Sequence, residues 1–168
     1  LALHAERAVR AGYAHTGLPP DFHQFVETFP YTETPDQEAA IIEVLDDLAE
    51  PTPMDRLVVG DVGYGKTEVA MRAAWRVILS GFQVAILCPT TVLAFQHYET
   101  FRKRFETLPV RVGMLSGFRP AAERKVVFED VAKGSVDILI GTTSLLGQDL
   151  RFKKLGLVVV DEEHRFGV

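Results

Sequence analysis

Apolar residues along this chain follow two periods, one typical of buried strands and one typical of amphipathic helices. Short aliphatic runs predict strands at 57–59, 84–88, 110–115, 138–140 and 157–160. Helical periodicity between them predicts helices at 66–79, 92–105 and 121–132, with a short turn near 144–146. Because strands that are aliphatic throughout are usually buried on both faces, the pattern predicts an α/β fold. It would have three layers, αβα, doubly wound around a mostly parallel sheet.

The N-terminal part of the chain is less regular. Residues 1–11 place apolar side chains on one helical face and are followed by Gly12, which favours a short helix. Residues 13–31 contain one glycine and three prolines, and we interpret them as an irregular linker packed by its aromatic side chains. The predicted organisation is an N-terminal helix and linker over 1–31, followed by one domain over 32–168.

A further helix is predicted to start at Thr34-Pro35-Asp36-Gln37. Thr34 can cap it, proline suits the first turn, and aspartate favours the positive end of the helix dipole. The buried stripe that follows consists of Ala40, Ile41, Val44, Leu45 and Leu48.

The segment Gly60-Asp61-Val62-Gly63-Tyr64-Gly65-Lys66-Thr67 fits the phosphate-binding pattern G-x-x-x-x-G-K-[ST] at every fixed position. The strand predicted before it and the helix predicted after it are the context that this pattern requires. Glycines let backbone N–H groups converge on phosphate oxygens, and the helix dipole adds positive potential. Lys66 would reach the β- and γ-phosphates, and the Thr67 hydroxyl would bind Mg²⁺. The alternative is a tight turn without a ligand.

The last predicted strand runs into Asp161-Glu162-Glu163-His164. Asp161 can hold Mg²⁺, and Glu162 can orient and deprotonate an attacking water. The two carboxylates can have separate roles because successive strand residues point in opposite directions. An acidic strand end is weak evidence alone, but after a phosphate loop it predicts nucleotide hydrolysis.

Composition and charge limit the partners. The net charge of −5 gives no overall attraction to nucleic acid, so any DNA binding must be local or shared with another domain. No apolar run approaches the roughly 20 residues of a membrane span, so no membrane partner is expected. The single cysteine, Cys88, excludes an internal disulfide and suits a reducing, cytoplasmic location. Within an aliphatic run, it is expected to be a small buried hydrophobe.

Lys66-Thr67 and residues 161–164 resemble motifs I and II of the superfamily 2 helicases and translocases. Pro-Thr-Thr-Val-Leu-Ala-Phe-Gln at 89–96 is similar to their motif Ia, P-T-x-x-L-A-x-Q. The resemblance is strongest to the bacterial translocases that couple DNA repair to transcription, and it extends over nearly the whole chain. Fork-reversal DNA helicases share the ending 164–168 but usually have glutamine where Glu163 stands. Both groups commonly have histidine where Thr143 stands.

The resemblance implies a RecA-like P-loop NTPase fold, ATP and Mg²⁺ as cofactors, and a first motor domain truncated after motif II. It implies translocation on double-stranded DNA, displacement of stalled RNA polymerase and recruitment of an excision-repair damage-recognition protein. RNA polymerase would bind a region outside this chain. A second motor domain of the same polypeptide would supply arginines, so the isolated chain is expected to be nearly inactive. A further strand, after Val168, would lie between the loop strand and the Asp-Glu strand.

The resemblance also implies site residues. Gln37 looks like the glutamine that exchanges two hydrogen bonds with adenine, although with Thr34 it also forms a capping-box pattern. Contacts to the DNA backbone are implied for Thr90, Thr91, Gln96, Gly141, Thr142 and Thr143; the alternative at the first of these segments is helix capping by Thr91. His164 would couple the γ-phosphate to the DNA-binding motifs, or be structural.

Three other functions remain open. A fork-reversal or branch-migration helicase would use the same chemistry on branched DNA. A non-motor P-loop phosphotransferase would need an acceptor pocket, and the motif Ia pattern argues against it. A non-catalytic, nucleotide-gated interaction module would not need Glu162.

Overall fold

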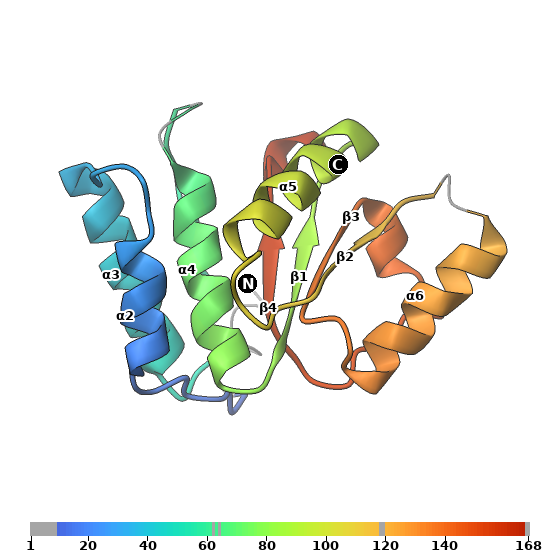
Figure 1. Cartoon of the computed structure of the whole chain (residues 1–168), viewed down its shortest axis with the longest axis horizontal. Coiled ribbons are helices and arrows are strands. Elements are labelled where there is room, and N and C mark those ends of the chain that lie inside the picture. The colour runs from blue at the N-terminus through green and yellow to red at the C-terminus, as the bar shows by residue number, and fades with distance from the viewer. Residues whose placement is uncertain (1–9, 62, 64, 118–119, 167–168) are drawn as a thin grey trace. The chain divides into compact units, whose positions relative to one another are not determined.

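The computed structural model of the chain describes residues 10–61, 63, 65–117 and 120–166. The chain divides into two compact units, one that ends at Ser80 and one that begins at Gly81. In Figure 1 the colours run from blue to green through the first unit and from green to red through the second. The helix predicted at 1–11 falls on residues that, up to position 9, lie outside the described part.

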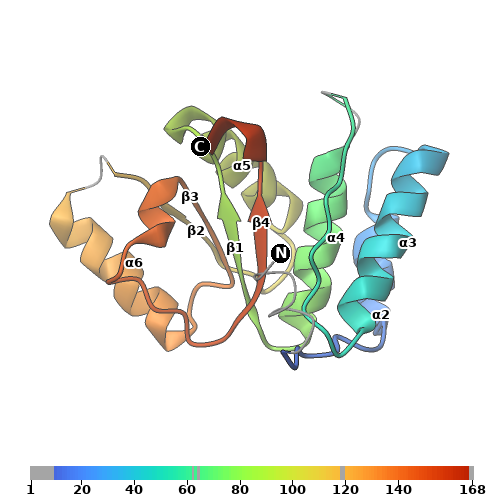
Figure 2. The same ribbon diagram turned by 180° about the vertical axis from the view of Figure 1, so that it is seen from behind.

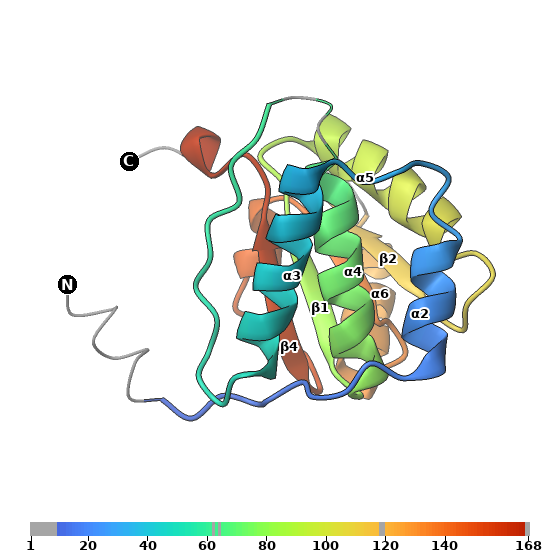
Figure 3. The same cartoon turned by 90° about the vertical axis from the view of Figure 1, so that its left-hand side faces the viewer.

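Three helices are present in the described part of the first unit: α2 (Pro20–Glu27), α3 (Pro35–Ala49) and α4 (Lys66–Leu79). Helices α2 and α3 both contact α4 (Figure 3). The Trp75 ring of α4 lies 6.0 Å from the Phe25 ring of α2, and its indole N–H donates to the Asp21 carbonyl at 3.2 Å. Aromatic packing therefore joins α2 to α4.

Helix α2 shows that the prediction of an irregular linker over 13–31 was wrong at 20–27. The helix begins with Pro20, whose fixed φ suits a first turn. Proline lacks an N–H, but at this position an N–H would have no acceptor within the helix, so nothing is lost. Phe22 and Phe25, spaced three residues apart, lie on one face and are buried. The prolines were interpreted as helix breakers, whereas here one of them starts a helix.

The helix predicted to start at Thr34 is confirmed as α3. Thr34 Oγ1 accepts the Gln37 N–H at 3.3 Å, and Gln37 Oε1 accepts the Thr34 N–H at 2.8 Å. This reciprocal pair is the capping box that the sequence predicted. The buried face of α3 consists of Ile41, Val44 and Leu48.

The strand predicted at 57–59 was wrong. Residues 57–59 form no β-ladder, and the Leu57 and Val59 side chains are 74% and 84% exposed. An extended segment becomes a strand only when another strand accepts its hydrogen bonds, and β-propensity alone does not provide one. Just before this segment, Arg56 pairs with α3: its Nε lies 2.5 Å from Asp47 Oδ2 and its Nη1 lies 2.5 Å from Glu43 Oε2.

A parallel sheet forms the centre of the second unit. Its strands are β1 (Gln83–Leu87), β2 (Val112–Leu115), β3 (Ile138–Gly141) and β4 (Leu155–Val160), in the spatial order β2-β3-β1-β4 (Figure 2). All three strand pairs are parallel. These strands match four of the predicted runs, and the parallel α/β class is confirmed.

Helices cover both faces of this sheet. Helix α5 (Thr91–Arg104) joins β1 to β2, and α6 (Ala121–Lys133) joins β2 to β3. The two connections run across the sheet in opposite directions. Because parallel crossovers are right-handed, opposite directions place α5 and α6 on opposite faces. Short 3₁₀ turns, η1 (Thr143–Leu146) and η2 (Glu163–Phe166), follow β3 and β4.

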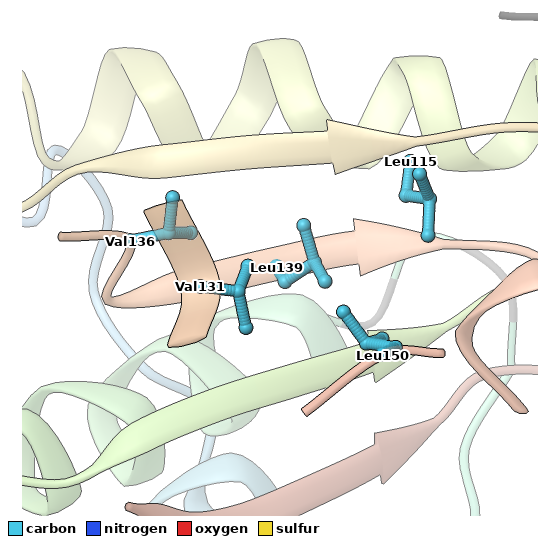
Figure 4. Close-up of a cluster of buried hydrophobic side chains, with 5 residues drawn as sticks. All are labelled: Leu115, Val131, Val136, Leu139 and Leu150. Atoms are coloured by element: carbon cyan, nitrogen blue, oxygen red, sulfur yellow. The ribbon is translucent and has the colours of Figure 1, made fainter. Parts of the chain in front are cut away.

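The core under α6 is a compact apolar cluster (Figure 4). It consists of Leu115, Val131, Val136, Leu139 and Leu150. Leu139 lies on β3 between Ile138 and Ile140, which point to the other face because strand side chains alternate. Both faces of β3 are therefore buried, as its unbroken aliphatic sequence predicted. Among the described residues, no helix has the length and apolar character that a membrane span requires.

Candidate nucleotide-binding site

The phosphate-loop segment ends at the start of α4. Gly65 caps α4 in the left-handed conformation, with φ 73°, and Gly63 is also left-handed, with φ 87°. Glycine adopts this conformation without the steric cost that a β-carbon brings. Val62 and Tyr64 lie outside the described residues. The helix after the loop is therefore the one that the pattern predicted, whereas the strand expected before the loop is absent from the described residues.

Lys66 folds back over its own loop. Its Nζ donates to the Asp61 carbonyl at 2.7 Å and also to the Gly60 carbonyl. The ammonium therefore lies within the curve of the loop, beside backbone from residues 60 and 61. Thr67 follows on the first turn of α4, half-buried.

This donor set fits a nucleotide phosphate chain. Lys66 supplies an ammonium and Thr67 a hydroxyl on the first turn of a helix of 14 residues, and the ammonium and the helix N-terminus both favour an anion. No group of three or more His, Cys, Asp or Glu side chains in the described ranges is arranged to hold a metal. Mg²⁺ characteristically combines one or two protein oxygens with phosphate oxygens, so the Thr67 hydroxyl suits a metal that arrives with the nucleotide.

Gln37 lies directly against the loop. A β-carbon built on Gly65 would be 1.9 Å from Gln37 Nε2 and 3.1 Å from its amide carbon. The other end of the amide, Oε1, accepts the Thr34 N–H. The structure thus confirms the capping role of Gln37 and adds a contact with Gly65 that the sequence did not reveal.

Asp161 and Glu162 lie at the carboxyl edge of the sheet in the second unit. The register aligns Leu87 with both Gly141 and Val160, so the three strands end together. The Asp161 N–H donates to the Leu87 carbonyl at 2.9 Å. Thr67, the other predicted metal ligand, belongs to the first unit.

Asp161 Oδ2 lies 2.6 Å from His97 Nε2 on α5. His97 was not singled out in the sequence analysis. The signal that could have found it is its position six residues into the helix after β1, on the turn before the buried Phe101. Its partner is 64 residues away in the chain, which no local pattern shows.

Glu162 is the only non-glycine residue of the described part with positive φ, at 49°. Asp161 and Glu162 were expected from the sequence to point in opposite directions because successive strand residues alternate. This reason was wrong, because β4 ends at Val160 and both residues lie in the turn after it. Arg165 Nε lies 2.9 Å from Glu162 Oε2, and the Arg165 N–H donates to the Glu162 carbonyl at 2.8 Å.

The predicted DNA-binding residues fall in two segments. Thr90, not Thr91, caps α5: its Oγ1 accepts the Leu93 N–H at 3.2 Å because its backbone is still extended. Gln96 is exposed on α5. Both segments follow strands that end at the carboxyl edge of the sheet.

The second of these segments begins inside the sheet. Gly141 is buried as the last residue of β3, and its carbonyl accepts the Cys88 N–H at 2.8 Å. Thr142 Oγ1 lies 3.4 Å from Ser144 Oγ, and Thr143 is exposed at the start of η1. His164 lies in η2, and its side chain is outside the described part, as are Gly167 and Val168.

Cys88 is fully buried, which agrees with the sequence prediction. Burial, and then the negative charge of Asp161, raise the pKa of its thiol to about 12. The thiol is therefore protonated at neutral pH and suits packing rather than nucleophilic chemistry.

Comparison with known proteins defines the class. The DEAD/DEAH box helicase family matches residues 34–168, and the chain belongs to this family of ATP-driven helicases and translocases. Its fold is RecA-like: a structure of RecG bound to a three-way DNA junction superposes with a TM-score of 0.89 and 35% identity, covering 99% of this chain and 23% of that one.

Transcription-repair-coupling factors from several bacteria are similar to this chain over its whole length. The chain is 54% identical over all of its 168 residues to that of Haemophilus influenzae, 53% to that of Escherichia coli and 49% to that of Bacillus subtilis. It spans about 15% of the length of the first two relatives and 14% of the third.

Proposed function

We propose that this chain binds Mg²⁺–ATP and that residues 32–168 form the first motor domain of a double-stranded DNA translocase of transcription-coupled repair. The observation that carries the proposal is the loop before α4, which contains two left-handed glycines and has the Lys66 ammonium hydrogen-bonded to its backbone. The full-length similarity to transcription-repair-coupling factors supports the biological context.

Each candidate residue has a chemical role in this proposal. Lys66 would exchange the carbonyls of residues 60 and 61 for phosphate oxygens, and Thr67 and Asp161 would hold Mg²⁺. When bound, the metal neutralises charge that develops on the phosphate. Glu162 would orient water and accept its proton.

Gln37 would contact adenine, and Thr90, Thr91, Gln96 and residues 141–143 would contact the DNA backbone. Such contacts grip any sequence and release it, as a translocase requires. His164 would link the nucleotide to these segments.

The relatives are named for the coupling of transcription and repair. The whole protein would displace stalled RNA polymerase, which binds a region outside this chain, and recruit the damage-recognition protein of nucleotide excision repair. A second motor domain would close on this one and complete the ATP site. The setting would be the bacterial cytoplasm, where DNA, RNA polymerase and ATP meet.

Substitution of Glu162 and Lys66 tests the proposal. In the full-length protein, Glu162→Gln should lower the rate of DNA-stimulated ATP hydrolysis at least ~100-fold and retain ATP binding. The substitution removes the base and leaves the phosphate ligands in place. Lys66→Ala should lose ATP binding. Glu129→Gln, an exposed carboxylate on α6, is the matched control. ATP binding without hydrolysis in both the wild type and Glu162→Gln would favour a non-catalytic, nucleotide-gated module, whereas wild-type hydrolysis in Glu162→Gln would show that Glu162 is not the base.

A fork-reversal helicase is the second candidate, favoured by the similarity to RecG bound to a three-way junction. Two assays on the full-length protein separate the candidates: release of a stalled RNA polymerase from duplex DNA, and regression of a model fork. Activity on forks alone would support the second candidate. A non-motor phosphotransferase would turn over a small acceptor without DNA.

A further inference from the structure

The hydrogen bond between His97 and Asp161 joins two elements of the second unit. His97 Nε2 lies 2.6 Å from Asp161 Oδ2, and the two side chains are 18% and 29% exposed. When the Asp161 carboxylate is ionised it only accepts hydrogen bonds, and His97 Nε2 is then the donor of this pair. Helix α5 is thereby tied to the residue that ends β4.

Both partners are held by their surroundings. The His97 ring meets the Phe101 ring edge-on, with centroids 6.3 Å apart, and Phe101 stacks on Phe105 at 6.1 Å. Both phenylalanines are buried. On the other side, the Asp161 N–H donates to the Leu87 carbonyl of β1. The imidazole and the carboxylate therefore meet from positions fixed by the core and by the sheet.

We propose that His97 is a positioning residue of the Mg²⁺–nucleotide site, which fixes the Asp161 carboxylate and makes its orientation depend on the position of α5. This inference rests on the proposed function, in which Asp161 binds the metal and the N-terminus of α5 contacts DNA. Hydrogen bonds that orient a metal-binding side chain contribute substantially to metal affinity.

Geometry gives this link a second consequence. His97 lies six residues after Thr91, which is about 9 Å along the helix at 1.5 Å per residue. A DNA contact that shifts α5 would move Nε2 relative to Oδ2, and hydrogen bonds weaken steeply with misalignment. DNA binding and metal binding would then be coupled, and the coupling must be equal in both directions.

The experiment measures metal dependence rather than turnover. In the full-length protein, the Mg²⁺ concentration for half-maximal binding of a fluorescent, non-hydrolysable ATP analogue is measured with and without duplex DNA. His97→Leu, which keeps the bulk of the side chain and removes the hydrogen-bond donor, should raise this Mg²⁺ concentration about 10-fold. His97→Gln, whose amide can donate from a similar position, should recover most of this loss. His23→Leu, at an exposed histidine of α2, should change nothing.

Each outcome is decisive. A lower melting temperature of His97→Leu with an unchanged Mg²⁺ midpoint would make His97 structural only and overturn the proposal. If DNA shifts the midpoint equally in wild type and His97→Leu, the coupling is refuted. If His97→Leu does not fold, His97→Asn, whose amide is too short to replace Nε2, takes its place. Lys66→Ala separates failure of the proposed function from failure of the His97 proposal. If Lys66→Ala binds the ATP analogue as tightly as wild type, the ATP site itself is refuted, whatever the result for His97.

Discussion

The amide of Gln37 lies so close to Gly65 that a β-carbon there would be 1.9 Å from its Nε2. The Oε1 atom of the same amide accepts the Thr34 N–H at 2.8 Å. One side chain thus joins the start of α3 to the turn that starts α4. The phosphate loop is therefore supported from outside by the capping box of another helix.

Gly65→Ala should damage this turn in two ways. Alanine at φ 73° carries a backbone cost of about 1 kcal/mol or more, and its β-carbon would displace the Gln37 amide. We expect a loss of stability of that order in urea denaturation, and at least ~10-fold weaker binding of an ATP analogue, which corresponds to about 1.4 kcal/mol.

Two further variants separate the causes. Gly60→Ala is the matched loop control for stability, because a β-carbon there would meet only the Lys66 side chain, at 3.6 Å. Adding Gln37→Ala to Gly65→Ala should recover the steric part of the loss and leave the backbone part. No recovery in the double variant would mean that the Gln37 contact is unimportant.

Gln37→Ala alone tests the adenine contact. If Gln37 recognises adenine, the variant should lose at least ~10-fold of its preference for ATP over GTP, measured by competition with a fluorescent nucleotide. The loss of the Gln37 half of the capping box should also lower stability, by less than the ~1 kcal/mol that an N-cap residue contributes, because Thr34 Oγ1 can still accept the N–H of residue 37. Gln24→Ala, at an exposed position of α2, is the control. Lower stability with unchanged nucleotide preference would leave Gln37 with the capping role only.

Gly141→Ala should destabilise the sheet before it affects DNA. A β-carbon at Gly141 would be 2.4 Å from the Leu115 carbonyl oxygen, which the backbone of β2 holds in place. Overpacking of this kind costs about 1–3 kcal/mol, measurable as a shift of the urea midpoint. Gly117→Ala, with no atom within 4 Å of its β-carbon, should be tolerated. Wild-type stability combined with weaker DNA binding would instead make Gly141 a functional glycine.

An ion-pair cluster on α4 predicts a loss of stability in acid. Arg72 donates to Glu68 Oε1 at 3.0 Å and also to Glu33, and its hydrogen bond to Glu33 lowers the pKa of that carboxyl below its usual 4.5. A depressed pKa contributes stability above the unfolded-state value, and this contribution is lost as pH falls below about 4.5.

Glu33→Gln should therefore reduce stability at pH 7 and flatten the fall in stability between pH 5 and pH 3, as followed by urea denaturation. Glu27→Gln, an exposed carboxylate at the end of α2, serves as control. An acid profile of Glu33→Gln identical to wild type would show that this pair adds no net stability. Arg72→Ala should be more damaging, because it leaves the Glu68 carboxylate buried without this cation.

Comparison of sequence with structure shows where local signals suffice. Helix α4 has the predicted bounds, Lys66–Leu79, because helical periodicity and a glycine turn are encoded in consecutive residues. The capping box at Thr34 is equally local. Residues 20–27 were predicted wrongly because proline is both a helix breaker and a good first residue, and only the burial of Phe22 and Phe25 decides between these.

The phosphate-loop pattern, the parallel α/β class and the candidate carboxylates could all be predicted from the chain, since each depends on residue types at short spacing. Which side chains meet became visible only in the folded structure. It placed His97 beside Asp161 and Gln37 beside Gly65, and it left residues 57–59 without a β-ladder. Helix caps and hydrophobic periodicity depend on residues that are close in the sequence, so they can be predicted from it. A β-ladder or a pair such as His97 and Asp161 needs a partner that is distant in the sequence, and only folding brings that partner near.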